Sequence, residues 1–495
     1  MTENRRHSLS DHAFEAVYHP IPQAPVASEP FRPSLELSSE ESDVELDSAN
    51  PPVEVDARIR WIHFVLGCAV LLPWNVMITA TPYFMSRLEG SSLQSSFSSY
   101  LSTTFTIANF SLLAHATATS KQASNSRRVL FSLTWLALLT ALLTASTWFH
   151  PPPGVFFTFV LLIGMLQASA GSYLQTAVVA VASLFGHRAM QAVMSGQAAV
   201  GVIISGVQVL SAAASTRIAP SPQVDVVALS RTAEENSAAL FFGLSTVFLV
   251  LTQFAQAWMT KLPGYRTLLA RSRSRVRPPP VDSGEIPDET HTLTAGGRKT
   301  MNGRVQMLRL VRLNLPYNIA VAYVFVITLS VYPPITISVR SSNPGTHQLL
   351  FSAIHFLVYN VGDLLGRFLC SLPRLLVWSA RRLLTFALAR TLFIPLFLIC
   401  NIQWSSPAAI RPIITSDVLF MLILLLFGLS NGYVSSMCMM AAPSVTHNPR
   451  LRGRTEDVDV AATVASFCLV GGLTLGSFAS FAVRAMVCDC NPFAA

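Results

Sequence analysis

The sequence predicts an all-α, polytopic membrane protein. Of its 495 residues, 51% are hydrophobic and only 12% are charged, about half the roughly 25% of charged residues in soluble globular domains. The chain contains nearly charge-free apolar runs that are longer than the ~18 residues needed to cross a hydrocarbon core. These runs are continuous rather than alternating, which disfavours a transmembrane β-barrel. The scarcity of charge also disfavours a soluble enzyme.

The charged residues gather in two segments. Residues 1–58 hold 16 of them, of which 12 are acidic, and residues 261–312 hold 15, of which 11 are basic. The first segment is rich in Ser, Pro and acidic residues and cannot bury enough apolar surface to fold, so it predicts a disordered cytoplasmic tail. The second segment is rich in Arg, Pro and Ser and predicts a flexible, basic cytoplasmic loop.

The remaining apolar runs predict eleven transmembrane helices. Their approximate ranges are 59–84, 97–118, 129–149, 155–183, 189–212, 238–260, 313–337, 349–373, 383–403, 416–442 and 459–484. The 261–312 loop divides them into six helices over residues 59–260 and five over residues 313–485. Only Gly186-His187-Arg188 separates the fourth helix from the fifth. Residues 486–495 are left as a short tail.

Basic residues in the loops predict the orientation, because Lys and Arg mark the cytoplasmic side of a membrane protein. With a cytoplasmic N-terminus, the short inner loops hold ten Lys and Arg and the outer segments hold six. An odd number of helices then places the C-terminal tail outside the cytoplasm. This rule also accounts for the net charge of +8, so no nucleic acid is expected as a partner.

Two ionisable residues stand in the middle of the eighth predicted helix, where charge is costly and therefore informative. Asp363 and Arg367 are four residues apart, so they share one helix face and can pair. Asn360 and Tyr359 lie on the same side one turn earlier. This stripe of donors, acceptors and a ring suits a polar, ring-bearing solute. A structural ion pair that holds the bundle together explains the spacing equally well.

Polar residues also interrupt other predicted helices. In the first helix, Pro73 removes a backbone hydrogen bond, and Trp74 and Asn75 offer a stacking surface beside an amide. Gln175 lies in the fourth helix, where solute binding and helix packing are equally good explanations. Arg390, in the ninth helix, is expected to lie near enough to the membrane surface for its side chain to snorkel.

Small residues in the fourth and fifth helices predict close helix packing. They are Gly171, Gly196 and Gly201. The seven Cys residues are too scattered for a zinc site or a disulfide framework. We therefore expect no metal and no cofactor.

Taken together, these segments resemble the equilibrative nucleoside transporter family over about residues 59–485. The motifs that carry the resemblance, in the family's order, are Pro73-Trp74-Asn75, Gly171 to Gln175, Met194-Ser195-Gly196-Gln197, Asn360 to Arg367, Arg390 to Asn401 and Ser430-Asn431-Gly432-Tyr433. Thr176 departs from the pattern, because a glycine usually follows the glutamine in the family. Departures of this kind affect the expected selectivity more than the fold.

The resemblance implies a facilitator of the major-facilitator type, with two helical bundles, that moves nucleosides, and in some members nucleobases, by alternating access. The family's aspartate and arginine, which engage the ribose hydroxyls, match Asp363 and Arg367. Its glutamine, which contacts the base, matches Gln175. The first-helix residues of the substrate site match Leu71, Trp74 and Asn75. Residues expected to serve helix packing or gating are Gly171, Gly196, Gly201, Asn360 and Asn431.

Other functions remain open at this point. In a proton-coupled transporter, Asp363, His355 or His63 would take up the proton, although a carboxylate already paired with Arg367 favours its charged form. A receptor without transport and a membrane-embedded enzyme are further alternatives, but the apolar runs hold no cluster of catalytic residue types. No catalytic residue is therefore expected. We expect a monomer in the lipid bilayer of the plasma membrane or of a vacuole or lysosome.

Overall fold

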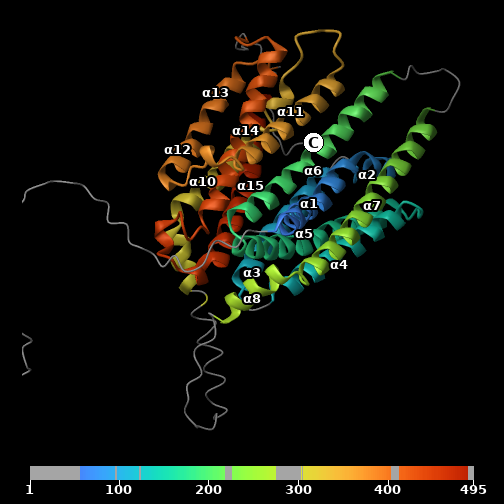
Figure 1. Cartoon of the computed structure of the whole chain (residues 1–495). Helices are drawn as coiled ribbons and strands as arrows, with labels where there is room; N and C mark the ends of the chain where they lie inside the picture. Colours follow the sequence, from blue (N-terminus) through green and yellow to red (C-terminus); the bar gives the residue numbers. More distant parts are fainter. Residues whose placement is uncertain are drawn as a thin grey trace, which may run out of the picture. The chain divides into compact units, whose positions relative to one another are not determined.

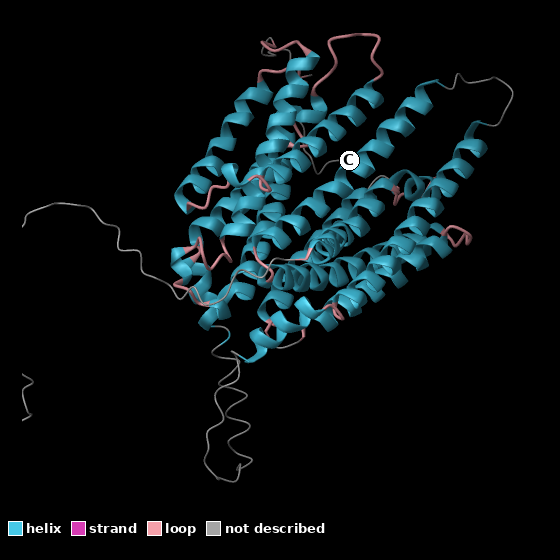
Figure 2. Ribbon diagram, in the orientation of Figure 1, coloured by secondary structure: helices cyan, strands magenta, loops and turns pink. Residues whose placement is uncertain are grey.

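The computed structural model of the chain describes residues 56–94, 97–121, 124–217, 226–274, 303, 305–402 and 412–488. Within these residues the chain is almost entirely helical (Figure 2), with two isolated β-bridges, Val339 to Ile402 and Cys400 to Ile414. The acidic tail up to residue 55 lies outside the described residues, as do the C-terminal residues from 489. The all-α prediction is confirmed.

Eight helices make up the first half of the described chain. They are α1 (Ala57–Thr79), α2 (Thr81–Arg87), α3 (Phe97–Ala118), α4 (Asn125–Ser146), α5 (Pro153–Leu184), α6 (His187–Arg217), α7 (Val226–Met259) and α8 (Pro263–Ser274). The Asp56 side chain caps α1 by accepting from the Arg58 amide at 3.0 Å. Gly186 has φ of 86° and ends α5. The predicted break between the fourth and fifth helices is therefore confirmed.

The second half continues the helical pattern with shorter pieces near its middle. Its helices are α10 (Leu315–Val331), α11 (Gln348–Leu369), α12 (Ala380–Ala389), α13 (Phe393–Leu398), α14 (Asp417–Ala441) and α15 (Val458–Cys488). The Ser416 side chain accepts from the Leu419 amide and caps α14. Of the 261–312 segment, the two described ends are helical, as α8 and over residues 305–313.

Nine helices in the described part of the chain are long and apolar enough to cross a membrane, against eleven predicted from the sequence. The difference lies in the second and ninth predicted helices. The second forms as α3, but eight of its 22 residues are Ser or Thr. The ninth is interrupted, because a 3₁₀ turn at Arg390–Leu392 separates α12 from α13. Pro395, which lacks an amide hydrogen, stands just after this turn.

The helices pack in two groups that follow the chain (Figure 1). In the first half α1 lies against α6, α4 against α7 and α3 against α5, and in the second half α11 lies against α14 and α10 against α15. The halves meet mainly where α11 packs on α6 and α15 packs on α5. The candidate binding residues Gln175 of α5 and Asp363 and Arg367 of α11 therefore lie on helices that join the halves.

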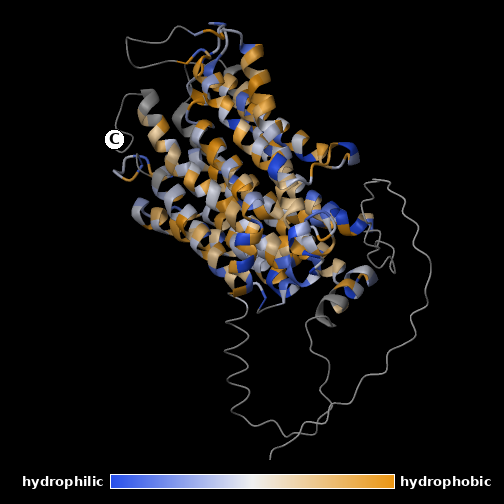
Figure 3. Cartoon of the chain, turned by 90° about the vertical axis from the view of Figure 1, so that its left-hand side faces the viewer, coloured by the Kyte–Doolittle hydropathy of each residue, from blue (hydrophilic) through white to orange (hydrophobic). Residues whose placement is uncertain are grey.

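Apolar side chains occupy both the interior and the outer surface of the helices. Figure 3 shows hydrophobic residues distributed through the helical body. Leu210, Phe254 and Val418 are among the exposed large apolar residues. An outer surface of this kind is what a hydrocarbon environment requires, and it agrees with a multi-pass membrane protein.

The close contact between α11 and α14 in the second half depends on glycines. At Gly432 of α14 a Cβ atom would overlap the backbone carbonyl of Asp363, and at Gly366 of α11 it would overlap that of Leu429. Glycine at these positions lets the two backbones approach. The contact holds Asp363 of α11 directly against α14.

Candidate functional site

Asp363 and Arg367 form an ion pair in the interior of the bundle. The Arg367 Nε atom donates to Oδ2 of Asp363 at 2.9 Å, and the two residues are 5% and 6% exposed, in that order. Their positions four apart on α11 bring them onto one face, as the sequence predicts. A buried pair of opposite charges costs desolvation on both sides, which makes this pair a candidate functional site.

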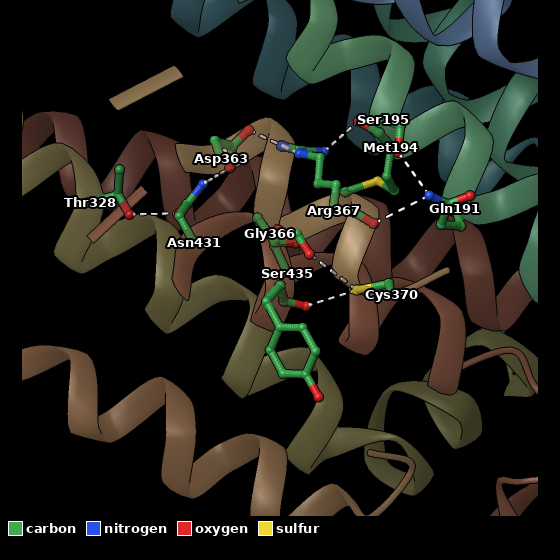
Figure 4. A network of polar contacts seen from close by, with 12 residues as sticks. Gln191, Met194, Ser195, Thr328, Asp363, Gly366, Arg367, Cys370, Asn431 and Ser435 are labelled. Carbon is green, nitrogen blue, oxygen red and sulfur yellow. Dashed lines mark hydrogen bonds and ion pairs between the residues drawn. The ribbon is translucent and has the colours of Figure 1, made fainter. Parts of the chain in front are cut away.

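Asn431 and Thr328 extend the pair into two neighbouring helices (Figure 4). Asn431 of α14 donates through Nδ2 to Oδ1 of Asp363 at 2.6 Å. Thr328 of α10 in turn donates its hydroxyl to Oδ1 of Asn431 at 2.8 Å. Both carboxylate oxygens of Asp363 therefore accept hydrogen bonds, one from its own helix and one from α14.

Arg390 stands at the far end of this network and is only 1% exposed. It donates to the Phe427 carbonyl at 3.0 Å and to Thr328 Oγ1 at 2.8 Å, and it also contacts Ser430. Its guanidinium lies 4.5 Å from the centre of the Phe427 ring. The expectation that Arg390 snorkels to the membrane surface is wrong, because its partners hold it among α10, α12 and α14.

Arg367 also reaches across to the first half of the chain. Its Nη1 atom donates to the Met194 carbonyl of α6 at 2.8 Å. Gln191, one turn earlier on α6, donates to the Arg367 carbonyl at 3.2 Å and to Ser195 Oγ at 3.0 Å. Figure 4 shows these α6 residues beside Arg367. The side chain that pairs with Asp363 therefore also joins the two halves.

One turn before Asp363, α11 carries a tyrosine whose ring stacks on the residue that directly follows α10. The ring of Tyr359 stacks on Tyr332, with centroids 4.0 Å apart and planes inclined by 23°. His355 lies one turn earlier, 5.1 Å from the Tyr332 ring, and its Nε2 atom is 2.8 Å from Thr336 Oγ1. Tyr359 therefore contacts a residue outside its own helix. Asn360, in contrast, donates to the Phe356 carbonyl of its own helix at 2.9 Å.

Gln175 makes a second polar link between the halves. Its Nε2 atom donates to Ser466 Oγ of α15 at 3.0 Å, and the residue is 9% exposed. Next to it, Phe110 of α3 stacks on Phe467 of α15 at 5.3 Å. In this arrangement the Gln175 amide serves helix contact, which leaves its Oε1 atom without a hydrogen-bond partner among the described residues.

The predicted first-helix residues lie on α1, which continues through Pro73 to Thr79. The Trp74 ring lies 4.1 Å from the ring of Phe105 on α3, inclined by 30°. Asn75 donates through Nδ2 to the Leu71 carbonyl at 2.9 Å. All three predicted residues, Leu71, Trp74 and Asn75, are partly exposed.

The structure brings some of the predicted site residues together and leaves others apart. Asp363 and Arg367 pair directly, and Asn431 joins them. Among the described residues, neither Trp74 nor Gln175 makes a hydrogen bond or ring contact with this pair. A solute that touched all of them would therefore have to lie between helices of the two halves.

Of the three glycines predicted to serve close helix packing, two lie at close helix contacts and one does not. At Gly196 a Cβ would overlap the Phe64 carbonyl of α1, and at Gly201 it would lie 2.6 Å from Oδ1 of Asn360. These two positions are close helix contacts, and the second brings α6 against α11. At Gly171 a Cβ would meet nothing within 4 Å. The prediction that Gly171 serves close packing is wrong, because no neighbouring helix approaches that face.

Three hydrogen-bond partners of the candidate site residues were not predicted. Thr328, Ser466 and the Met194 carbonyl all lie on other helices, far away in the chain. Thr328 is a polar residue in an apolar run, which is a weak signal of an internal hydrogen bond, and a backbone carbonyl gives no sequence signal. Within the described residues, no group of three His, Cys, Asp or Glu side chains could hold a metal ion.

The chain was compared with known proteins. The model of the nucleoside transporter family matches residues 160–485. Equilibrative nucleoside transporter 1 of Rattus norvegicus is 26% identical over 486 residues, which covers 89% of this chain and all of the relative. Equilibrative nucleoside transporter 2 of the same species is 28% identical, over 86% of this chain and 96% of the relative. Nucleoside transporter FUN26 of Saccharomyces cerevisiae is 25% identical, over 84% of this chain and 82% of the relative.

Among solved structures, the major facilitator superfamily transporter FucP in its outward conformation is similar. Its TM-score is 0.50 at 14% identity, and the alignment covers 87% of this chain and 97% of that chain. This likeness confirms the predicted two-bundle, major-facilitator-like fold. Because the family model matches well over half of the chain, the protein belongs to the nucleoside transporter family.

Proposed function

We propose that this protein moves nucleosides across a membrane, down their concentration gradient, by alternating access. The single observation that carries the proposal is the buried Asp363–Arg367 pair, which is tied to Asn431 in one half and to Met194 in the other. The relatives that share most of the chain are named as nucleoside transporters. Nucleobases are a further substrate class under this proposal.

The pair offers both kinds of group that a vicinal diol needs. A ribose has two neighbouring hydroxyls, which can donate to the Asp363 carboxylate and accept from the Arg367 guanidinium. The Nη2 atom of Arg367 has no hydrogen-bond partner among the described residues, so the guanidinium retains donors for a solute. Fixed polar groups in an otherwise apolar site are typical of small-molecule binding.

We assign the base to the first half of the chain. The Trp74 ring, partly exposed on α1, offers a stacking surface, and the Leu71 and Asn75 side chains lie on the same helix. The Gln175 amide is able to read a base edge once it leaves Ser466. A nucleoside between the halves would then touch α1 and α5 with its base and α11 with its ribose.

The proposal also links substrate binding to the conformational change. Arg367 and Gln175 each donate a hydrogen bond to the opposite half. Because a ligand shifts an equilibrium only by its differential affinity for the two states, groups that bind the solute and also join the halves are suited to such coupling. For the two halves to separate at these positions, the hydrogen bonds from Arg367 to Met194 and from Gln175 to Ser466 must both break.

The proposal also covers the oligomeric state, the membrane and the orientation of the protein. We propose a monomer that catalyses no chemical reaction. We place it in the plasma membrane or in a vacuolar or lysosomal membrane, with the N-terminus in the cytoplasm. The relatives include mammalian equilibrative transporters and the yeast protein FUN26. Imaging of a fluorescent fusion beside organelle markers tests the membrane, and protease protection of the two termini tests the orientation.

Uptake of radiolabelled adenosine and uridine in a host without nucleoside transport tests the function. The host expressing this protein should accumulate at least one of the two nucleosides faster than the empty host. Asp363→Ala, checked for its amount in the membrane, should lose most of this uptake. No uptake above background in any membrane accessible to the assay, with the protein present there, contradicts the proposal.

A further inference from the structure

A pocket of about 430 Å³ opens between the two halves, and Asp363 is not among the residues that line it. From the first half it is lined by Arg60 near the start of α1 and by the first turns of α6. From the second half it is lined by the end of α11 and the segment that follows. The lining residues are Arg60, His187, Arg188, Gln191, Cys370, Ser371, Pro373 and Leu376.

The charged residues that line this pocket are all basic. Arg60 and Arg188 carry guanidinium groups, and no Asp or Glu is among the lining residues. Both arginines are exposed, and neither guanidinium has an ion-pair or hydrogen-bond partner among the residues that the structure describes. Two guanidinium groups that line one pocket with no acidic residue beside them make its electrostatic potential positive, which favours an anion there.

The first turn of α6 adds to the positive potential. His187 is the first residue of this 31-residue helix, and Arg188 follows it. The first amide groups of a helix have no acceptor within the helix, so they favour an anion at that end. His187 and Gln191 supply further side-chain donors to the same pocket. Arginine is suited to phosphate because its planar group forms two parallel hydrogen bonds.

We propose that this pocket binds a phosphomonoester anion through Arg60 and Arg188. The volume exceeds that of a phosphate group, so there is room for an attached glycerol or sugar. Two sources share this chemistry. One is the headgroup of an anionic lipid, since basic pockets between membrane helices bind such headgroups, and the other is a soluble phosphomonoester.

Binding here would act on the contact between the halves. Arg60 and Arg188 belong to the first half, whereas Ser371 and Leu376 belong to the second. Gln191, which lines the pocket, also donates to the Arg367 carbonyl, and Figure 4 shows it beside Arg367 and Cys370. An anion that contacts both walls would stabilise the arrangement in which these segments lie together.

The test is the thermal stability of the full-length protein in lipid nanodiscs. Discs of phosphatidylcholine are compared with discs that also contain phosphatidic acid, a lipid phosphomonoester, or phosphatidylglycerol, a diester, at equal surface charge. Soluble glycerol 3-phosphate is added to the phosphatidylcholine discs as a separate arm. The variant Arg60→Gln/Arg188→Gln removes the two pocket charges. The control Arg381→Gln/Arg382→Gln removes two exposed arginines of α12 that do not line the pocket.

Phosphatidic acid or glycerol 3-phosphate should raise the Tm of the wild type by about 3 °C near saturation. The pocket variant should lose this rise and the control variant should keep it. A rise with phosphatidic acid alone assigns the site to lipid, and a rise with glycerol 3-phosphate assigns it to a soluble anion. No rise in the wild type, an equal rise with phosphatidylglycerol, or an equal rise in the pocket variant overturns the proposal. If the double variant does not fold, Arg188→Gln replaces it in the same comparison.

Discussion

Arg367 donates to the backbone carbonyl of Met194 at 2.8 Å, although the two residues lie on helices from opposite halves of the chain. The same guanidinium holds Asp363 at 2.9 Å through its Nε atom. The position of the Arg367 guanidinium, and with it the ion pair, therefore depends on the position of α6 as well as on α11. A change in the position of α6 relative to α11 would alter the groups available to a solute at Asp363.

Gly432→Ala should destabilise the protein by about 1–3 kcal/mol, because the added Cβ would overlap the Asp363 carbonyl and push α11 from α14. Gly171→Ala is the matched control. A Cβ at Gly171 meets nothing within 4 Å, so this variant should be neutral or stabilised by up to about 1 kcal/mol. Thermal unfolding followed by size-exclusion chromatography measures both. Equal stability of the two variants would show that α11 and α14 do not pack as described.

Much of the fold is predictable from the sequence because the length of an apolar run sets the length of a helix. The range 97–118 matches α3, and most other helix ends fall within a few residues of the prediction. The interruption of the ninth helix was not predicted, although Pro395 and Arg390 both stand in that run. A proline near a buried charge is a signal that hydropathy alone overlooks.

The candidate site was predictable where its residues share one helix. Asp363 and Arg367 pair because they are four residues apart, which the sequence shows directly. The links to Asn431 and Met194 depend on which faces of α11, α14 and α6 meet, and residue spacing within one helix does not contain this information. Gly171 illustrates the same limit, since a glycine allows close packing only where a second helix is present.

Gln175→Ala should raise the KM for nucleosides about tenfold, because one hydrogen bond to the base is lost. Ser466→Ala is the control, since it removes the partner of Gln175 on α15 but leaves the amide for the solute. Initial rates of adenosine and uridine uptake over a concentration series give the KM of each variant. If Ser466→Ala raised the KM as much as Gln175→Ala, the role of Gln175 would be helix contact alone.

Arg390→Lys should lower the free energy of unfolding by about 2–3 kcal/mol, because lysine cannot donate to both Thr328 and the Phe427 carbonyl from one planar group. Uptake per folded molecule should also fall, since Thr328 positions Asn431 on Asp363. Arg381→Lys, at an exposed position on α12, should change neither quantity. Thermal unfolding and transport assays on matched amounts of protein measure the two effects. Wild-type stability of Arg390→Lys would show that the Arg390 contacts contribute nothing.

An imposed pH gradient should leave the initial rate of nucleoside uptake unchanged. Both oxygens of Asp363 are already engaged, one by Arg367 and one by Asn431, and the proposed cycle uses this carboxylate to hold the solute rather than to carry a proton. The measurement is uptake into proteoliposomes with and without an acidic outside, at constant internal pH. A several-fold stimulation by the gradient would instead support proton coupling, with His63 and His355 as the next residues to change.

The most direct test of the central claim is nucleoside uptake by purified protein in proteoliposomes, compared between the wild type and Asp363→Leu/Arg367→Met. The double variant removes both buried charges together, so neither is left unpaired, and its Tm should stay close to that of the wild type. Its uptake should nevertheless fall at least about 100-fold, as expected if two charged hydrogen-bonding groups contact the solute. Wild-type uptake by a folded double variant would contradict the account, because the pair would then be structural.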